Sequence, residues 1–310
     1  MEDTDDFDFQ LLDDDIDSND LGTIYPCTQN IVSKYITKDE VNDFCNFSDP
    51  TALNILHINC RSIKRNFGSL TNFINLFSSH LTAIAVTETW LTESLNDVYS
   101  IPGYNFFANS RTMKLGGGVG LYVKKNLSCK IRPDLCRMSS YIECIFLECQ
   151  QVNMKSFIIG SIYRPPNSDI SQFNSDLLTI LNDLTKSKHK LAFLAGDFNL
   201  NLINANTHAA TGEFLNNLQS FNFAPTVKNP TRISDTSATL IDNIFINGIE
   251  REYTCSSAII YSDISDHLPV ALHLKRNSRS KSYKTVNYAN KRYFDSKSID
   301  EFNTELANID

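Results

Sequence analysis

The chain has 310 residues, of which 42% are hydrophobic and 21% charged, which is typical of a globular protein with one large domain or two average ones. The formal charge of -8 is unevenly spread, because the first twenty residues carry ten acidic and no basic side chains, while residues 275–292 carry seven basic and no acidic ones. The sequence shows no apolar run that could span a membrane, no secretory signal and no CxxC pair among its eight cysteines. We therefore expect an intracellular protein with reduced thiols and no contact with membranes.

The first 50 residues are rich in Asp, Asn and Ser and lack hydrophobic periodicity. Such a segment cannot bury enough apolar surface to order itself, so residues 1–50 are predicted to form an acidic, disordered tail. The pattern then changes. Residues 53–59 predict a buried strand, residues 63–81 repeat apolar side chains at steps of three and four as one face of a helix, and residues 82–86 predict a second strand. The domain therefore begins as a β-α-β unit.

Strands outnumber helices in the rest of the domain. Further helices are predicted at residues 170–184 and 214–221. Further strands are predicted near Tyr104 and from Gly118, Tyr141, Met154, Lys190, Ala238 and Leu268. Many strands with few helices predict an α/β fold in which helices cover the outer faces of packed sheets.

The apolar pattern fades after residue 274. Residues 276–310 predict a basic linker and then a short helix that contains Phe294, Ile299, Phe302 and Leu306. The chain is accordingly divided into an acidic tail at residues 1–50, one domain at residues 51–275, and this linker with its helical tail.

Polar residues stand repeatedly at the ends of the predicted strands. They are Asn59, Glu88, Tyr163, Asp197, Asn199, Asp266 and His267, together with Asp242, which interrupts an apolar strand. Side chains at strand ends converge on one edge of a sheet, where ligand sites are usually built. The sequence therefore predicts one site to which all of these residues contribute.

Each of these residues also has a structural interpretation. Residues 196–199 form a typical turn sequence, and Asn59 and Glu88 suit the starts of helices. The Asp-His pair before residue 268 could lie in a surface loop. Asp242 is harder to explain in this way, because a carboxylate within an apolar strand needs a partner if it is buried, and His267 is the natural candidate.

Three other features are assigned to structure rather than to chemistry. The glycine-rich residues 116–120 lack the strand-then-helix setting of a phosphate-binding loop, so they predict a hairpin or a flexible loop. His57 and the four other histidines outside the predicted site show no metal-ligand spacing. Trp90 is expected to pack beside Glu88 and hold its loop.

The residue types at the predicted site match the requirements of phosphodiester hydrolysis. That reaction uses a hard divalent cation with oxygen ligands, a water molecule activated by a carboxylate, and donors for the charge that develops on the phosphate. Glu88 with Asn59 would supply the cation site, which suits Mg²⁺, and Asp197 would be the base for the water molecule. His267, fixed by Asp242, would act in its charged form.

Seven ordered motifs add a family resemblance. They are LNILHINCRS, TETWL, GGGVGLYV, SIYRPP, LAGDFN, ATLIDNIF and SDHLPV, and in this order and spacing they resemble the exonuclease-endonuclease-phosphatase superfamily over residues 52–274. The NxRS, TETWL, YRPP and ATLID forms are similar to its branch in non-LTR (LINE-type) retrotransposons, the apurinic-like endonuclease. The resemblance implies a four-layer α/β/β/α sandwich of two packed mixed β-sheets with outer helices, in agreement with the strand-rich pattern.

The resemblance also implies a role for each site residue. It places Asn59, Glu88 and Asp266 at the metal ion, with Mg²⁺ or alternatively Mn²⁺ as the cofactor. It places Tyr163 and Asn199 on the scissile phosphate, Asp197 as the base or water-orienting group, Asp242 with His267 as a pair that stabilises the phosphorane-like transition state, and Thr239 in the same site. The division of roles between Asp197 and His267, and the choice between one and two metal ions, stay open.

The implied activity is that of a Mg²⁺-dependent endonuclease that nicks one strand of duplex DNA in the nucleus and leaves a 3′-hydroxyl and a 5′-phosphate. No reverse transcriptase motif follows in this chain, so we expect a truncated copy of an element, a partial gene or a retained stand-alone endonuclease. Two alternatives stay open. One is a phosphoester hydrolase of the same superfamily that acts on abasic-site DNA, RNA or a phosphoinositide, and the other is a catalytically decayed nucleic-acid-binding remnant.

Residues 21–274 carry a net charge near -1, which is a small basic content for a protein that binds DNA phosphates. Local basic pairs would therefore have to line the DNA groove. The candidates are Lys64 with Arg65, Arg111 with Lys114, Lys124 with Lys125, and Arg164. Modest affinity that depends on groove shape and deformability is expected.

Overall fold

The computed structural model describes residues 31–45, 49, 51–78, 80–92, 98–112, 116–151, 156–186, 191–247, 253–276 and 303–304. The chain divides into two compact units, residues 1–277 and residues 278–310. The second unit is described only at residues 303 and 304, which are helical, so the predicted linker and most of the predicted C-terminal helix lie outside the described residues. All elements below belong to the first unit.

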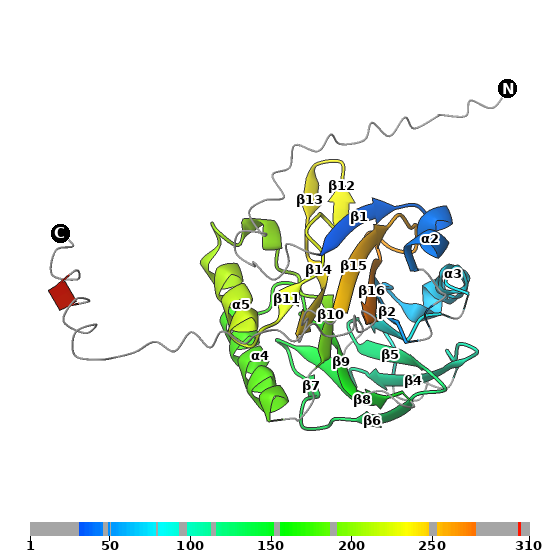
Figure 1. Ribbon diagram of the computed structural model, residues 1–310, viewed down its shortest axis with the longest axis horizontal. Helices are drawn as coiled ribbons and strands as arrows, with labels where there is room; N and C mark the ends of the chain where they lie inside the picture. The colour runs from blue at the N-terminus through cyan, green and yellow to red at the C-terminus, as the bar shows by residue number, and fades with distance from the viewer. Residues whose placement is uncertain are drawn as a thin grey trace, which may run out of the picture. The chain divides into compact units, whose positions relative to one another are not determined.

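The first sheet runs in the order β1-β15-β16-β2-β3-β5-β4 (Figure 1). Its strands are β1 (Val32–Ile36), β2 (Leu53–Asn59), β3 (Ala83–Thr87), β4 (Tyr104–Asn109), β5 (Val119–Lys124), β15 (Tyr253–Ile260) and β16 (Val270–Arg276). β2 pairs in parallel with β3 and β1 in parallel with β15, whereas the other neighbours are antiparallel. This sheet is therefore mixed.

The second sheet runs in the order β11-β14-β10-β9-β8-β6, and β7 also pairs with β8. Its strands are β6 (Ser128–Ile131), β7 (Arg137–Met138), β8 (Glu143–Gln150), β9 (Phe157–Tyr163), β10 (Ala192–Asp197), β11 (Ala224–Pro225) and β14 (Asp242–Asn247). β9 and β10 are parallel and the other pairs antiparallel, so this sheet is mixed as well. A short hairpin of β12 (Arg232–Ser234) and β13 (Ser237–Thr239) precedes β14.

The two sheets pack face to face and helices cover their outer faces. β10 lies over β2 and β9 over β3, with one hydrophobic core between them. α3 (Ile63–Asn75) packs on the outer face of the first sheet, while α4 (Ile170–Thr185) and the neighbouring α5 (Ala209–Ser220) pack on the second (Figure 1). Burial on both faces explains why the central strands are apolar throughout. The predicted four-layer α/β/β/α sandwich is confirmed.

The covering helices begin at capping side chains. The Ser62 hydroxyl accepts a hydrogen bond from the Arg65 N–H at the start of α3, and the Asp169 carboxylate accepts one from the Gln172 N–H at the start of α4. Because Ser62 follows closely after the end of β2, its cap also fixes the turn that leaves Asn59. No helix in the described part of the chain combines the length and the apolar character needed to cross a membrane.

The domain begins earlier than the sequence predicts. Residues 32–36 form β1, which extends the first sheet beside β15, and the chain continues into η2 (Lys38–Glu40) and α2 (Val41–Cys45). Ile36 and Val41 are buried in the core on the outer side of this sheet. The prediction of a disordered tail to residue 50 is therefore wrong for residues 31–45, and residues 1–30 lie outside the described part of the chain.

Candidate active site

Asn59, Glu88 and Asp197 meet at the carboxyl ends of strands from both sheets. Asn59 and Asp197 are the last residues of β2 and β10, which pack against each other, and Glu88 follows β3. The Nδ2 amide group of Asn59 donates to Oε1 of Glu88 at 3.0 Å and to Oδ2 of Asp197 at 2.9 Å. One buried amide thus joins three side chains that the sequence places at separate strand ends.

The loops that carry the site have unusual backbone conformations. Glu88, Trp90 and Asn199 have φ angles of 52°, 53° and 48°, and Arg61 and Ser62 have φ angles of 37° and 84°. Strained non-glycine conformations cost about 1 to 3 kcal/mol each and cluster at functional sites. The Ser62 N–H donates to the Glu88 carbonyl at 2.8 Å, which ties the loops after β2 and β3 together.

Asp197 is fully buried and is held by Asn199. The backbone N–H of Asn199 donates to Oδ1 at 3.0 Å, and its side-chain amide donates to Oδ2 at 3.3 Å and to the carbonyl of Arg164 at 2.8 Å. Burial raises the pKa of Asp197 to about 7, and the charge of Asp242 adds to the shift while the charge of His267 opposes it. A carboxylate that titrates near neutral pH is suited to accept a proton from water.

Asp242 is a fully buried acceptor for three side chains. Its Oδ2 accepts from Nδ1 of His267 at 2.9 Å and from Oγ1 of Thr231 at 2.8 Å, and its Oδ1 lies 3.1 Å from Nε2 of His57. Burial alone would raise the pKa of Asp242, but the charge and hydrogen bond of His267 and then those of His57 outweigh it and hold the pKa well below its usual range. Asp242 is therefore ionised, and it is hydrogen-bonded to the histidine with which the sequence pairs it.

His267 is the cationic partner of these two carboxylates. Burial would lower its pKa, but the charge and hydrogen bond of Asp242, followed by the charges of Asp197 and Asp266, raise the pKa to about 9. Its Nδ1 lies 3.9 Å from Oδ2 of Asp197. Near neutral pH the site therefore holds an imidazolium, an ionised Asp242 and an Asp197 close to its titration point.

The same cluster offers ligand atoms for a metal ion. Asp197, Asp242 and His267 each provide one ligand atom, and these atoms lie within 4.8 Å of one another. Nδ1 of His267, however, faces Asp242 and carries a proton near neutral pH, and Mg²⁺ prefers oxygen ligands. The carboxylates of Glu88 and Asp197, which share the amide of Asn59, form a second set that is rich in oxygen. The donor chemistry of the site therefore fits a hard divalent cation.

Asp266 lies next to His267 in the chain, but two arginines occupy its carboxylate. Oδ1 accepts from Nη1 of Arg61 at 2.9 Å, and Oδ2 accepts from Nε and Nη2 of Arg232 at 2.9 Å and 2.6 Å. Partial burial would raise the pKa of Asp266, but Arg232 and His267 outweigh it and lower the pKa. Both oxygens are engaged, so Asp266 anchors two basic side chains here, and its role as a metal ligand stays a prediction.

Tyr163 lies at the site as predicted from its strand position. It ends β9 directly beside Asp197 in the parallel register, and it is buried. Burial, and then the negative charges of Glu88 and Asp197, raise the pKa of its hydroxyl. Tyr163 is therefore a neutral phenol that can donate to an anion.

Thr239 does not take the position that the sequence assigns to it. It lies on β13, where its hydroxyl donates to the carbonyl of Arg232 at 3.5 Å. Thr231 donates to Asp242 in its place, and the Thr231 N–H bonds to the carbonyl of Thr239 at 2.9 Å across the base of the hairpin. The hairpin thus brings the two threonines together and turns only Thr231 toward the carboxylate.

Like Thr231, His57 is a site residue that the sequence pattern does not predict. It is fully buried on β2 between Leu56 and Ile58, and its Nε2 reaches Asp242 on the opposite sheet. Among the described residues, its Nδ1 has no hydrogen-bond partner. The available signal was its position two residues before Asn59, on the strand face that carries Asn59 into the site.

Two of the arginines predicted to line a DNA groove have structural partners. Arg164 is 5% exposed, and its guanidinium group donates to the carbonyls of Phe198 at 2.8 Å and Asn199 at 2.7 Å. Arg111 forms an ion pair with the fully buried Glu143. Arg164 therefore fixes the loop that carries Asn199, and the prediction that it lines a groove is wrong.

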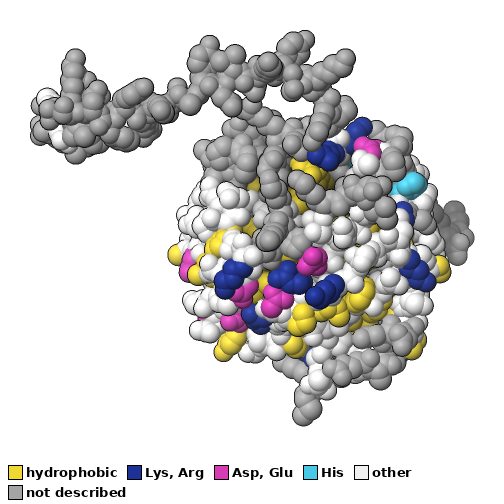
Figure 2. All heavy atoms as spheres, turned by 60° about the horizontal axis from the view of Figure 1, so that its bottom comes forward, with side chains coloured by type: hydrophobic (Ala, Val, Ile, Leu, Met, Phe, Trp, Pro, Cys, Tyr) yellow, Lys and Arg dark blue, Asp and Glu magenta, His cyan; other side chains and the backbone are white. Residues whose placement is uncertain are grey.

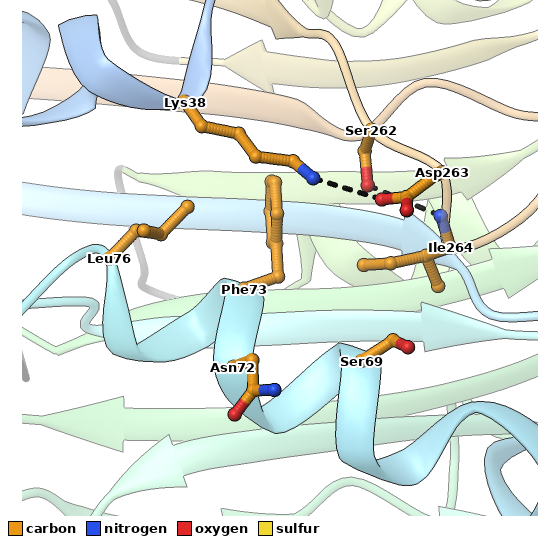
Figure 3. A pocket seen from close by; sticks show the side chains of 8 residues that line it. All are labelled: Lys38, Ser69, Asn72, Phe73, Leu76, Ser262, Asp263 and Ile264. Atoms are coloured by element: carbon orange, nitrogen blue, oxygen red, sulfur yellow. Dashed lines mark hydrogen bonds and ion pairs between the residues drawn. The ribbon is translucent and has the colours of Figure 1, made fainter. Parts of the chain in front are cut away.

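A hollow of about 240 Å³ lies elsewhere, between α3 and the loop after β15 (Figure 3). Lys38 and Asp263 form an ion pair of 2.9 Å at its edge. It is lined by Lys38, Ser69, Asn72, Phe73, Leu76, Ser262, Asp263 and Ile264. None of these residues belongs to the cluster around Asp197, so the hollow is separate from the candidate active site.

Comparison with known proteins gives a family match. The family model described as the endonuclease/exonuclease/phosphatase family matches residues 56–267. That segment begins within β2 and ends at His267, so it contains every residue of the site described above. A search of curated protein sequences finds no match.

Several solved structures share the fold at low sequence identity. The endonuclease domain of TRAS1, a telomere-specific non-LTR retrotransposon, is 13% identical with a TM-score of 0.57, and the match covers 73% of this chain and all (100%) of that one. The AP endonuclease LMAP from Leishmania major is 14% identical with a TM-score of 0.57, covering 74% and 90%. A mannosyl-6-phosphatase from Bacteroides thetaiotaomicron is 13% identical with a TM-score of 0.53, covering 72% and 99%. These similarities describe the fold, which hosts more than one activity.

Proposed function

The chain belongs to the endonuclease/exonuclease/phosphatase family, whose members are hydrolytic phosphoesterases, and on that premise we propose that it is a Mg²⁺-dependent endonuclease that nicks one strand of duplex DNA in the nucleus. One observation carries this proposal. Asp197, a buried carboxylate with a pKa of about 7, lies beside His267, a buried imidazolium. This pair supplies a base and a cationic donor at one point.

Each residue has a separate role in the proposed hydrolysis. Asp197 accepts a proton from the attacking water molecule, whose oxygen forms a bond to phosphorus as the bond to the 3′-oxygen breaks. The 3′-oxygen leaves as a hydroxyl after taking up a proton from solvent water, and the phosphate stays on the 5′ end. The His267 imidazolium and the Tyr163 hydroxyl donate to the non-bridging oxygens, where negative charge builds up. Asn199 orients Asp197 through two hydrogen bonds.

Glu88 and Asn59, together with Asp197, would hold the cation. Mg²⁺, or Mn²⁺ in its place, would neutralise charge on the phosphate when bound. Asp242 keeps His267 protonated and oriented, and it stays ionised because three donors surround it. Each residue thus has a partner that holds it in the protonation state its role requires.

DNA contact would rest on a few basic side chains near the site. Arg61, Lys64 and Arg65 are exposed in the loop after β2 and the first turn of α3. Lys124 and Lys125 lie at the opposite end of β5 from Val119, the residue that pairs with the last residue of β3, and so they are remote from the site. On the face shown in Figure 2, Lys and Arg side chains lie among Asp and Glu side chains near the centre. Modest affinity with a shallow salt dependence is expected, because the slope grows with the number of phosphates that basic side chains neutralise.

A retrotransposon origin is part of the proposal. It is supported by the NxRS, TETWL, YRPP and ATLID wording of the sequence and by the similarity in fold to the TRAS1 endonuclease domain. A comparison of substrates tests it against the other phosphoesterases of the family. Supercoiled plasmid, an abasic duplex and a soluble inositol phosphate are offered side by side with Mg²⁺, and plasmid is expected to become the nicked circle. Turnover of the inositol phosphate alone would exclude a nuclease.

Two variants separate an active enzyme from a decayed one. Asp197→Ala and His267→Ala should each lower plasmid nicking by about 100-fold or more, because Asp197 is the proposed base and His267 the proposed cationic donor to the phosphate. A wild-type protein no more active than these variants would identify a nucleic-acid-binding remnant. A map of the nicks on random-sequence plasmid would then give the target preference.

A further inference from the structure

Trp90 is fixed beside the candidate active site and still exposed. It is the only tryptophan in the chain, and it is 42% exposed. Its Nε1–H donates to Oε2 of Glu88 at 3.3 Å, and its backbone N–H donates to the carbonyl of Gly117 at 2.9 Å. Both N–H donors of the residue are therefore engaged, so the exposed side-chain surface left for a ligand is apolar ring.

A glycine-rich segment fixes the backbone at Trp90. Trp90 has a φ of 53°, in the region that favours glycine, and it bonds to a turn in which Gly116, Gly117 and Gly118 have φ angles of 91°, 65° and 84°. A Cβ atom on Gly117 would lie 2.5 Å from the guanidinium carbon of Arg111, so the turn packs tightly. The glycine-rich hairpin thus holds the indole in place.

A cation lies next to this ring. A Cβ atom on Gly116 would be 3.9 Å from both Nε1 of Trp90 and Nη1 of Arg111, so the indole edge and the guanidinium group flank the same glycine. Arg111 is anchored by the fully buried Glu143, which also accepts a hydrogen bond from the Gly118 N–H. An aromatic face with an adjacent fixed cation is the combination that binds a nucleobase together with its phosphate.

Other exposed hydrophobic side chains lack this setting. Tyr261, which is 39% exposed, stacks on Tyr35 with ring centroids 5.7 Å apart. Leu178, which is 37% exposed, lies on the outer helix α4. Trp90 is the exposed large hydrophobic residue, among those the structure describes, that is hydrogen-bonded to a residue of the candidate site.

We propose that Trp90 is a nucleobase subsite, on which an unstacked base of the cut strand, next to the scissile phosphate, stacks while Arg111 faces its phosphate. This inference rests on the proposed nuclease function. Inside a regular duplex the base faces are covered, so the subsite favours steps at which a base unstacks easily. A mismatched or unpaired base at that position is therefore expected to increase nicking.

The single tryptophan supplies a direct readout. The full-length Asp197→Ala protein with Mg²⁺ is titrated with a short duplex that contains a mapped nicking site, and tryptophan fluorescence is followed. Stacking should quench the emission. The cut strand is then scanned with an abasic analogue, one position at a time, and the quenching should disappear at one position beside the scissile phosphate. Quenching that survives removal of every base would overturn the proposal.

Variants separate stacking from an effect through Glu88. Trp90→Ala should weaken binding of the intact duplex by about 5- to 150-fold, the range for one stacked base, and should have little effect on the duplex that lacks that base. Trp90→Phe keeps a ring but not the N–H donor, and it should retain most of the affinity. Leu178→Ala is the matched control and should bind both duplexes as the parent protein does.

The outcomes also distinguish this inference from the proposed function. If Trp90→Ala weakens both duplexes equally, Trp90 acts through the loop and the subsite is excluded, even though plasmid nicking by the wild-type protein still supports a nuclease. If the wild-type protein nicks no plasmid but base-dependent quenching persists, the subsite stands and the nuclease proposal fails. Should Trp90→Ala fail to fold, the abasic scan on the Trp90-containing protein still decides the question.

Discussion

Asp242→Asn should move the alkaline limb of the pH profile of nicking to lower pH. Burial and then the charge of Asp242 raise the pKa of Asp197 to about 7, and at His267 the charge and hydrogen bond of Asp242 outweigh burial and raise the pKa to about 9. Since the proposed reaction needs Asp197 deprotonated and His267 protonated, the wild-type rate should rise near pH 7 and fall near pH 9. Removing the charge lowers the pKa of His267, so the alkaline limb should move to lower pH. At Asp197 the loss of the Asp242 charge and the loss of the His267 charge act in opposite directions, so the acidic limb should move less.

The size of the shift follows from the value for His267. Its pKa of about 9 lies well above its ordinary value of 6.5, and burial without Asp242 would favour the neutral imidazole. A return to 6.5 corresponds to about 3 kcal/mol of lost preference for the imidazolium. At pH 7.5 about one tenth of the molecules would then carry the proton, so the rate should fall about tenfold from protonation alone.

The pH dependence of the free energy of unfolding gives an independent test of the raised pKa of His267. A histidine whose pKa is raised on folding contributes stability that is fully present below pH 6.5 and is lost as the pH rises through about 9. Urea unfolding of the wild-type protein should therefore show a falling free energy of unfolding between pH 7.5 and 9.5, by about 2 kcal/mol. In Asp242→Asn this slope should flatten.

The assay is initial nicking of plasmid from pH 5.5 to 10 at saturating Mg²⁺. Asp263→Asn is the matched control, because Asp263 is a surface acid that pairs with Lys38 outside the site. It should leave both limbs in place. If Asp242→Asn keeps its alkaline limb near pH 9, then Asp242 does not set the charge of His267 and the mechanism is wrong.

Three further changes have defined expectations. His57→Leu leaves Oδ1 of Asp242 without its donor in a buried site and should cost about 1 to 3 kcal/mol in urea unfolding, whereas a His57→Gln protein as unstable as His57→Leu would argue against the lost donor as the cause. Gly196→Ala should cost about 3 kcal/mol or more, because its Cβ atom would lie 1.9 Å from the Ile162 carbonyl oxygen; an unchanged unfolding midpoint would contradict that clash. EDTA should abolish nicking, and added Mg²⁺ or Mn²⁺ should restore it. Glu88→Gln should raise the Mg²⁺ concentration needed for half-maximal activity by about tenfold or more. An unchanged Mg²⁺ requirement would remove Glu88 from the proposed metal site.

The convergence of the site was predictable from strand ends. Asn59, Glu88 and Asp197 follow apolar runs that can only be central strands, and parallel neighbours bring such ends to one edge. Pairing of Asp242 with His267 was predictable for a different reason, because a carboxylate in an apolar strand requires a partner. In both cases the information lies within a short segment of sequence.

The missed residues depend on contacts between segments. His57 reaches Asp242 because β2 lies against the second sheet, and a strand's own alternation does not reveal what faces it. The Thr231 N–H bonds to the carbonyl of Thr239 at the base of a hairpin. Thr239 is the nearer of the two to Asp242 along the chain, yet Thr231 is the one that donates to its carboxylate. The strand β1 was missed because its five residues pair with β15, more than two hundred residues away, within a polar region.

Asp266 shows how long-range contacts determine the role of an acidic residue that stands beside a histidine in the sequence. From sequence, an acid beside His267 suggests a metal ligand, yet Arg61 from the loop after β2 and Arg232 from the hairpin occupy its two oxygens. Exposed ion pairs of this kind contribute little to stability, so their consequence is positional. Asp266 holds two cations at the rim of the site, where a phosphate backbone would pass, and its charge also helps to raise the pKa of His267. In the proposed mechanism Asp266 therefore contributes to substrate attraction through Arg61 and Arg232 and to the positive charge of His267.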